Sequence, residues 1–262
     1  MTGFPRKPFA EARTIDQEMV LKDAKQLLKM PARRLFGKQA ITLGGLSLLS
    51  GCSLTNEKSI NQFLTAVSRL NDGVQGWMFD PAKLAPEYPI SMLTKPFPFN
   101  AFYDVDSTPE VDGTHYRLEV SGLIQDKHSW SLSELYSLPA SSQVTRHICI
   151  EGWSAIGRWG GTSFAGFLKR IGADTSAKYV GFKCADDYFE SIDMATALHP
   201  QTLLTFSYDG QLLPPKYGYP MKLRIPTKLG YKNPKHIVAI YVTNTYPGGY
   251  WVDQGYNWFG GV

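Results

Sequence analysis

The chain has 262 residues, of which 43% are hydrophobic and 19% charged, so it is long enough for one large domain with a packed core. Its 17 prolines and 24 glycines favour a fold rich in strands and loops over a helical bundle. Residues 1–51 hold nine Lys and Arg against four Asp and Glu, which leaves 18 against 19 in residues 52–262. The net charge of +4 therefore comes from the beginning of the chain, and the balanced remainder argues against nucleic-acid binding.

The first 51 residues have the pattern of an export leader. Arg33 and Arg34 precede a short apolar run, residues 41–49, which is far shorter than the ~20 residues of a membrane-spanning helix. This pattern resembles a twin-arginine signal, which implies export of a folded protein to the periplasm or cell envelope. The alternative is a cytoplasmic N-terminal helix with a basic face, although Gly44 and Gly45 would weaken such a helix.

The apolar run ends in Leu49-Ser50-Gly51-Cys52. This segment resembles a bacterial lipobox, in which the cysteine becomes the lipidated first residue of the mature chain. The resemblance predicts a mature protein of residues 52–262 with a membrane tether through Cys52. An ordinary secreted protein with an unmodified Cys52 is the alternative.

Beyond the leader, apolar spacing predicts short helices among strands. Ser131 and Glu134 form a capping box at the start of one predicted helix, and Asp209-Gly210 is typical of a hairpin turn. Asn71-Asp72-Gly73 is expected to end the first helix, and a glycine turn is expected just before residue 163. The helices are predicted at 57–71, 131–138 and 163–171, and the strands at 116–124, 143–151, 179–183, 188–192, 203–208, 221–225 and 237–242. Residues 77–113 are expected to be irregular but ordered, so the pattern favours one α+β domain.

The chain contains Cys52, Cys149 and Cys184, and no C-x-x-C pair, which excludes a cysteine-rich zinc site. On a strand, His147, Cys149 and Glu151 would share one face. A thiolate binds soft metals, but one thiolate cannot hold a labile metal alone, so further ligands must come from elsewhere. Two simpler interpretations stay open, namely a Cys149–Cys184 disulfide and two buried apolar thiols.

The segment Arg146-His-Ile-Cys149-Ile-Glu-Gly-Trp-Ser, followed by Gly-Arg158-Trp-Gly-Gly-Thr, closely resembles the molybdenum loop of the sulfite-oxidase-fold molybdopterin enzymes. The resemblance implies an α+β fold of mixed sheets and short helices. It also implies that Cys149 is the sole protein ligand to molybdenum, because the cofactor dithiolene supplies two further sulfurs. Arg158 is then the one additional arginine near Cys149 and a second catalytic candidate.

Three further segments carry the resemblance, which covers roughly residues 95–245. Residues 100–104 resemble a pterin-contacting segment of the bacterial methionine-sulfoxide reductase branch. Residues 217–226 resemble a cofactor-binding segment in which the family's usual arginine is Lys222, and residues 229–235 resemble a Gly-x-Lys-x-x-Lys phosphate-binding segment. The implied cofactor contacts are Asn100, Phe102, Tyr103, Asp104, Arg146, Tyr217, Lys222, Lys232, Asn233 and Lys235.

The basic segment supports a phosphate site on its own terms. Residues 222–236 contain five Lys and Arg and no carboxylate, and clustered donors suit the terminal phosphate of molybdopterin. A solvated basic loop is the alternative for this segment taken alone. Its combination with the Cys149 loop favours the cofactor.

Together these patterns predict an exported, molybdopterin-dependent oxidoreductase with a leader at 1–51, a helix and linker at 52–94 and the cofactor domain at 95–262. It would perform two-electron oxygen-atom transfer, either sulfite oxidation or sulfoxide reduction, with the chemistry carried by the cofactor. Because the sequence has no C-x-x-C-H haem motif, electrons would pass to or from a separate haem protein or membrane subunit. The alternatives are a lipoprotein that kept the fold without the cofactor and a hydrolase with Cys149 as nucleophile and His147 as base.

Overall fold

The computed structural model describes residues 57–262, so the predicted leader and Cys52 lie outside the described residues. Residues Thr65–Val262 form one compact unit, and Met1–Leu64 form another, of which only the beginning of helix α3 (Glu57–Met78) is described. No helix among the described residues is long and apolar enough to cross a bilayer.

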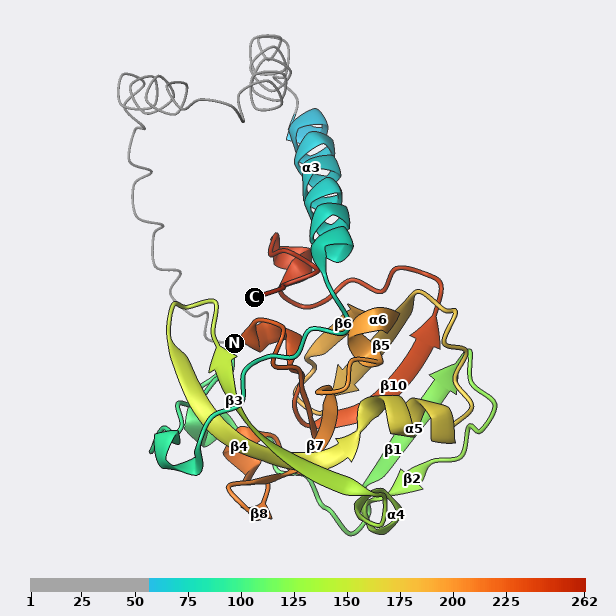
Figure 1. The fold of residues 1–262 in the computed structure, drawn as a ribbon. Coiled ribbons are helices and arrows are strands. Elements are labelled where there is room, and N and C mark those ends of the chain that lie inside the picture. The colour runs from blue at the N-terminus through green and yellow to red at the C-terminus, as the bar shows by residue number, and fades with distance from the viewer. Residues whose placement is uncertain (1–56) are drawn as a thin grey trace, which may run out of the picture. The chain divides into compact units, whose positions relative to one another are not determined.

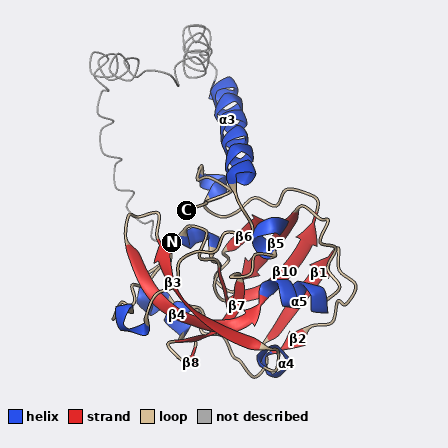
Figure 2. Ribbon diagram, viewed as in Figure 1, coloured by secondary structure: helices blue, strands red, loops and turns tan. Residues whose placement is uncertain are grey.

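The larger unit is built from two five-stranded sheets (Figures 1 and 2). The first has the order β2-β1-β10-β5-β6, and its one parallel pair, β1 with β10, joins strands from opposite ends of the domain sequence. The second has the order β3-β4-β7-β8, with β9 also paired to β7, and is antiparallel throughout. The strands are β1 (Arg117–Gly122), β2 (Trp130–Ser131), β3 (Ala140–Ile148), β4 (Ser154–Ser163), β5 (Tyr179–Cys184), β6 (Phe189–Asp193), β7 (Leu203–Tyr208), β8 (Gln211–Leu212), β9 (Lys222–Arg224) and β10 (Ile237–Thr243).

Short helices cover the sheets and contribute to the core. They are α4 (Leu132–Tyr136), α5 (Phe164–Arg170) and α6 (Met194–Ala197), with 3-10 turns η2 (Ile90–Met92), η3 (Val105–Ser107), η4 (Pro215–Tyr217), η5 (Gly230–Lys232) and η6 (Val252–Gln254). The main core joins apolar side chains of both sheets, and Phe164 and Phe167 of α5 are buried within it. A second cluster around Phe97, Trp159 and Tyr217 lies under the pocket described below. The α+β prediction is confirmed.

Most predicted elements are present with small shifts of their ends. The capping box at Ser131 and Glu134 forms as expected, with the Glu134 amide donating to Ser131 Oγ. The hairpin turn at Asp209-Gly210 also forms, and both residues adopt the positive φ angles that such a turn requires.

Two predicted features of the chain are wrong. The first helix does not end at Asn71-Asp72-Gly73 but continues to Met78, because the Asp72 carboxylate accepts hydrogen bonds from the Asn257 side chain and the Phe259 backbone. The expected glycine turn before residue 163 is part of strand β4. Gly161 belongs there for a packing reason, since a Cβ would collide with the Leu204 backbone in β7.

The strand that carries the cysteine is also shorter than predicted. Strand β3 ends at Ile148, and Cys149 begins a tight turn into β4. The Cys149 amide donates to the Trp153 carbonyl at 2.9 Å, and Gly152 adopts a φ of 91° that few other residues tolerate. The turn fixes Cys149 at the end of a rigid hairpin.

Candidate cofactor pocket

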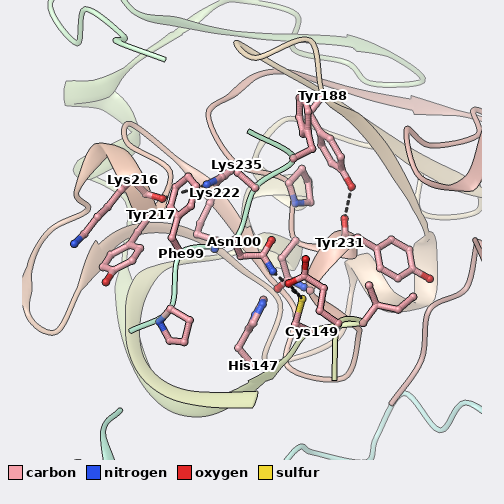
Figure 3. A pocket seen from close by; sticks show the side chains of 18 of the residues that line it. Phe99, Asn100, His147, Cys149, Tyr188, Lys216, Tyr217, Lys222, Tyr231 and Lys235 are labelled. Atoms are coloured by element: carbon pink, nitrogen blue, oxygen red, sulfur yellow. Dashed lines mark hydrogen bonds between the residues drawn. The ribbon is translucent and has the colours of Figure 1, made fainter. Parts of the chain in front are cut away.

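A pocket opens where five segments of the chain meet (Figure 3). They are the segment before residue 103, the β3–β4 turn, the β5–β6 turn, η5 with the loop after it, and the C-terminal segment. These segments are distant in the sequence, yet they bring together seven of the twelve predicted site residues. The seven that line the pocket are Asn100, Phe102, Cys149, Tyr217, Lys222, Asn233 and Lys235.

Cys149 is buried, with its sulfur facing the pocket (Figure 3). The side-chain amide of Asn100 donates to Cys149 Sγ at 3.2 Å, and Glu151 Oε2 lies 3.5 Å from the same sulfur. Burial, and secondarily the Glu151 carboxylate, raise the pKa of the Cys149 thiol above its usual value, although the backbone amides of Glu151 and Ile150 oppose this. In this environment only a bound cation or metal would favour the thiolate strongly.

Cys149 and Cys184 are both free and buried, so the disulfide alternative is wrong. The hydrolase alternative also lacks its geometry. His147 lines the pocket, but neither of its ring nitrogens has a hydrogen-bond partner, so no nucleophile–base pair with Cys149 forms. Burial, with Arg224 and Lys222 nearby, lowers the pKa of His147 well below its usual value.

The wall of the pocket opposite the hairpin turn is basic. Lys222 is buried with its ammonium 4.7 Å from the Trp159 ring centre, and Lys235 donates to the Lys216 carbonyl at 3.1 Å. No carboxylate among residues 57–262 forms an ion pair with either lysine. Burial lowers the pKa of Lys222 well below its usual value and that of Lys235 to about 8. Two buried, unpaired ammonium groups make this wall a site for an anion.

Arg224 stands behind this wall and was not predicted as a site residue. Its guanidinium is fully buried and donates to the Arg146 carbonyl at 2.6 Å, to Thr145 Oγ1 at 3.1 Å and to Asn233 Oδ1 at 3.2 Å. Asn233 in turn accepts from the Ile225 amide, so its oxygen is occupied within the protein. These two residues hold β3, β9 and the loop after η5 together, and burial lowers the pKa of Arg224 to about 9.

Three predicted arginine and acid contacts lie away from the pocket. Arg146 is one residue out of phase with His147, so it points to the other face of β3, where its guanidinium lies 5.2 Å from the Tyr88 ring centre. Arg158 precedes the pocket-lining Trp159 in β4 and likewise lies outside. Asp104 is exposed at the start of η3. Arg146 and Arg158 do not line the pocket because successive residues of a strand point to opposite faces, and Asp104 does not line it because its side chain is exposed.

Tyr103 and Lys232 are also absent from the pocket lining, for a different reason. Tyr103 donates to Asp186 Oδ2 at 3.0 Å, and its ring centre lies 5.5 Å from the Lys235 ammonium, so it supports the basic wall from outside. The Lys232 ammonium is 2.6 Å from Glu190 Oε1, and both side chains are essentially inaccessible. Lys232 is therefore occupied by an internal ion pair rather than free for a phosphate.

The rings of Phe102, Tyr188, Trp251 and Tyr256 line one part of the pocket. Phe102 stacks on Tyr250 with ring centres 4.8 Å apart, and Tyr250 contacts both Tyr188 and Trp251. The contacts continue from Trp251 to Tyr256, with ring centres 5.2 Å apart. Tyr188 comes from the β5–β6 turn, and Tyr250, Trp251 and Tyr256 come from the C-terminal segment. The glycine- and aromatic-rich composition of the C-terminal segment was the sequence signal for these three rings. We call Phe102, Tyr188, Tyr250, Trp251 and Tyr256 the aromatic rim.

The donor set suits molybdopterin. It comprises a buried thiol for a soft metal, unpaired ammonium groups for a phosphate and unpartnered ring nitrogens of His147 for a polar ligand. Among the described residues, no group of three or more His, Cys, Asp and Glu is arranged to hold a metal ion. A pocket-facing thiol beside a wall that suits a large anion is the arrangement that a cofactor-dependent redox enzyme of this kind requires.

Comparison with known proteins identifies the family within this class. Residues 105–251 match the family described as "Oxidoreductase molybdopterin binding domain". The chain belongs to this family and is a molybdenum-dependent oxidoreductase whose cofactor is molybdopterin.

Individual relatives agree with this assignment. A protein of Azospira oryzae, provisionally named protein-methionine-sulfoxide reductase subunit YedZ1, is 66% identical over 240 residues, or 92% of each chain. The protein-methionine-sulfoxide reductase catalytic subunit MsrP of Ralstonia nicotianae is 30% identical over 201 residues, which is 65% of this chain and 60% of that protein. The MsrP protein of Burkholderia mallei is matched over 49% of its length, so the chain spans only half to three fifths of these two MsrP proteins.

Among solved structures, the sulfane dehydrogenase SoxCD of Paracoccus pantotrophus resembles the chain with a TM-score of 0.50. The sequences are 18% identical, and the match covers 53% of this chain and 40% of that one. This likeness concerns the fold alone. It agrees with the sulfite-oxidase-type fold predicted from the sequence.

Anion binding in the pocket should depend on the protonation of Lys235. Its pKa of about 8 means that the free pocket loses this charge as the pH rises, whereas a bound anion favours the charged form. Affinity should therefore be highest below pH 8 and fall above it, by at most about tenfold per pH unit for each proton taken up. The charged or titratable groups that interact with Lys235 are Asp186, Cys184 and Lys222.

Sulfate, whose charge is constant in this range, is the suitable probe for cofactor-free protein at fixed ionic strength. Calorimetric titration between pH 7 and 9.5 should show this decline for the wild type and a flatter profile above pH 8 for Lys235→Gln. Equal slopes in the two proteins would contradict a role for Lys235 in holding the anion.

Proposed function

We propose that the chain is the catalytic subunit of a reductase for a neutral sulfoxide, of the kind carried by oxidised methionine side chains. The observation that carries this proposal is the aromatic rim, four of whose five rings line the Cys149 pocket while Tyr250 packs against them. Aromatic rings bind thioether groups well, since the polarizable sulfur interacts favourably with aromatic rings, and a thioether is the product of sulfoxide reduction. The names of the Azospira and Ralstonia relatives point to the same substrate.

Sulfite oxidation is the second candidate, and the charges around Cys149 argue against it. Sulfite is a small anion, which should require cationic side chains close to the metal ligand. Arg158 lies outside the pocket, whereas Glu151 lies 3.5 Å from the Cys149 sulfur and Asp186 also lines the pocket. With Lys222 and Lys235 assigned to the anionic part of the cofactor, these carboxylates would repel sulfite but tolerate a neutral sulfoxide.

We assign the thiolate of Cys149 as the metal ligand and Lys222 and Lys235 as the residues that hold the anionic part of the cofactor. When bound, molybdopterin supplies the two-electron oxygen-atom transfer chemistry. Asn100 donates to the sulfur and so orients it and stabilises its negative charge. The reaction converts the sulfoxide, two electrons and two protons to the thioether and water.

The proposal is tested with protein purified from a host that makes the cofactor. Methionine sulfoxide reduction with a reduced viologen dye should be faster than sulfite oxidation with an artificial acceptor by at least about 100-fold in kcat/KM, equivalent to about 2.7 kcal/mol of transition-state discrimination. Phe102→Ala should raise KM for methionine sulfoxide with a smaller effect on kcat, because Phe102 contacts the substrate rather than the metal. A preference for sulfite in fully loaded protein would contradict the proposal.

Electrons are proposed to come from a separate haem protein or membrane subunit. The Azospira and Ralstonia relatives are named as subunits, and no haem-binding C-x-x-C-H motif occurs in the sequence. The fully loaded chain alone should therefore reduce sulfoxide only when an artificial electron donor is supplied. Turnover with a soluble nicotinamide cofactor as sole donor would contradict this part of the proposal.

Export through the twin-arginine route, and lipid attachment at Cys52, are proposals that rest on the sequence pattern of residues 33–52. Arg33→Lys together with Arg34→Lys should trap the protein in the cytoplasm. Cys52→Ser should release it from the membrane fraction without lowering its molybdenum content. Both results can be read by fractionation and mass spectrometry of the mature N-terminus.

A further inference from the structure

Helix α3 has two faces with different surroundings. One face contacts the C-terminal segment of the same unit: Asp72 accepts hydrogen bonds from Asn257 and Phe259, and a Cβ on Gly76 would lie 3.8 Å from the Phe259 ring. Just past the helix end, the Phe79 ring packs edge-on against Phe259 with ring centres 5.7 Å apart. Figure 1 shows this end of α3 beside the C-terminal segment. This face is fixed within the domain.

The opposite face exposes a row of large apolar side chains. At 100° per residue, positions 67, 70, 74 and 77 lie about half a turn away from positions 72, 76 and 79. Val67 is 47% exposed, Leu70 69%, Val74 46% and Trp77 85%, and the adjacent Met78 is 71% exposed. Since this row, which we call the α3 stripe, points away from the contacts of its own domain, those contacts cannot cover it.

The spacing of the stripe is that of a coiled-coil seam. Residues 67, 70, 74 and 77 alternate by three and four, as a and d positions do, and the same spacing continues in the sequence to Phe63 and Ile60. The a positions are then Ile60, Val67 and Val74, all β-branched, and the d positions are Phe63, Leu70 and Trp77. β-Branched a positions with leucine at d favour two parallel helices.

The charge of α3 disfavours a lipid surface as the occupant. Helices that lie on membranes have a wide apolar face and a polar face rich in lysine and arginine. The polar face of α3 has no excess of basic residues, because the helix contains two acidic and two basic residues, Glu57, Lys58, Arg69 and Asp72. The observed pattern therefore fits a second helix of the same kind better than anionic lipid.

The exposed area is sufficient for a dimer. The five side chains of the stripe expose on the order of 600 Å² per copy, so two copies could bury about 1,200 Å², near the lower limit for specific interfaces. We propose that α3 pairs in parallel with α3 of a second copy of this chain through the α3 stripe.

The test uses the cofactor-loaded chain with Cys52→Ser, which removes any lipid. Sedimentation velocity from about 1 to 100 µM should show a reversible monomer–dimer equilibrium. Leu70→Glu should weaken dimerisation by about tenfold or more, because a carboxylate would be buried against its copy. Arg69→Glu, one residue away on the flank of the helix, should leave the equilibrium nearly unchanged and serves as the matched control.

Oxidative cross-linking tests whether the two α3 helices of the dimer run parallel. In the same background, Val74→Cys should form a disulfide-linked dimer because parallel a positions face each other, whereas Arg69→Cys should not. Efficient linkage only between a Val67→Cys copy and a Val74→Cys copy would overturn the parallel arrangement. A wild-type chain that stays monomeric at 100 µM but floats with vesicles of neutral or anionic lipid would overturn the dimer itself.

Discussion

Replacing Cys149 by alanine should yield a folded protein that has lost most of its molybdenum. We propose the Cys149 thiol as the soft metal ligand of the pocket, and the Asn100 side chain donates directly to it. Loss of a metal ligand should cost more than the 10–100-fold typical of residues that only support a ligand, so sulfoxide reduction should fall by more than about 100-fold. Elemental analysis of protein from a host that makes the cofactor measures the first effect, and dye-linked kinetics the second.

Cys184→Ala is the matched control for this experiment. Cys184 is also a buried free thiol, in β5, but it is absent from the pocket lining. Its substitution should lower thermal stability modestly while leaving molybdenum near one atom per chain. Equal molybdenum in Cys149→Ala and wild-type protein, with both folded by circular dichroism, would contradict the assignment of Cys149 as the ligand.

Cys149→Ser separates the ligand from the pocket. A serine hydroxyl has almost the same size as the thiol but does not ionise near neutral pH. Any cofactor that remains in this variant is held by Lys222, Lys235 and the rest of the pocket rather than by sulfur. Partial retention of pterin with loss of the metal–thiolate absorption would show that the basic wall binds the cofactor independently.

The sequence predicted the Cys149 end of the pocket well because the signal there is local. The hairpin turn is one continuous segment, and its resemblance to the molybdenum loop carries the position of the sulfur with it. Asn100 and Lys222 also line this pocket, although each lies in a separate segment. Arg146 was not, since a residue three positions from Cys149 on a strand falls on the other face.

The remaining errors have tertiary causes. Gly160 and Gly161 resemble a turn in the sequence, but they lie in β4 because β7 passes too close for side chains. The first predicted helix continues beyond residue 71 because Asp72 finds partners in the last residues of the chain. Such partners, far away in the sequence, leave no trace in local spacing.

Lys232 shows the same limit in the candidate site. A lysine in a basic loop is expected to be free for a phosphate, yet its ammonium lies 2.6 Å from Glu190 and also donates to the Ser191 carbonyl at 2.6 Å. Glu190 belongs to β6, more than forty positions earlier in the sequence. Sequence reasoning could find Glu190 only through the observation that a buried strand contains an unexplained carboxylate.

The Glu190–Lys232 pair should be a main determinant of stability and of the shape of the pocket. Lys232 ends η5, whose Gly230 backbone approaches Asn100 and His147 and whose Tyr231 carbonyl accepts from Tyr188. Glu190→Gln would leave a buried ammonium without its counter-charge, which typically costs 3–5 kcal/mol, or several degrees of melting temperature. Cofactor retention should fall in parallel, because η5 carries part of the pocket.

A double-mutant cycle measures how much of the stability contributed by Glu190 and Lys232 depends on both residues being present. Glu190→Gln and Lys232→Met should each destabilise the protein strongly, whereas the double variant should lose less than the sum, because neither charge is then left unpaired. Lys95→Gln is the control: its ion pair with Asp209 is largely exposed, so its loss should cost no more than about 1 kcal/mol. Additive losses in the cycle, measured by urea unfolding, would show that Glu190 and Lys232 act independently and that η5 is positioned by its other contacts.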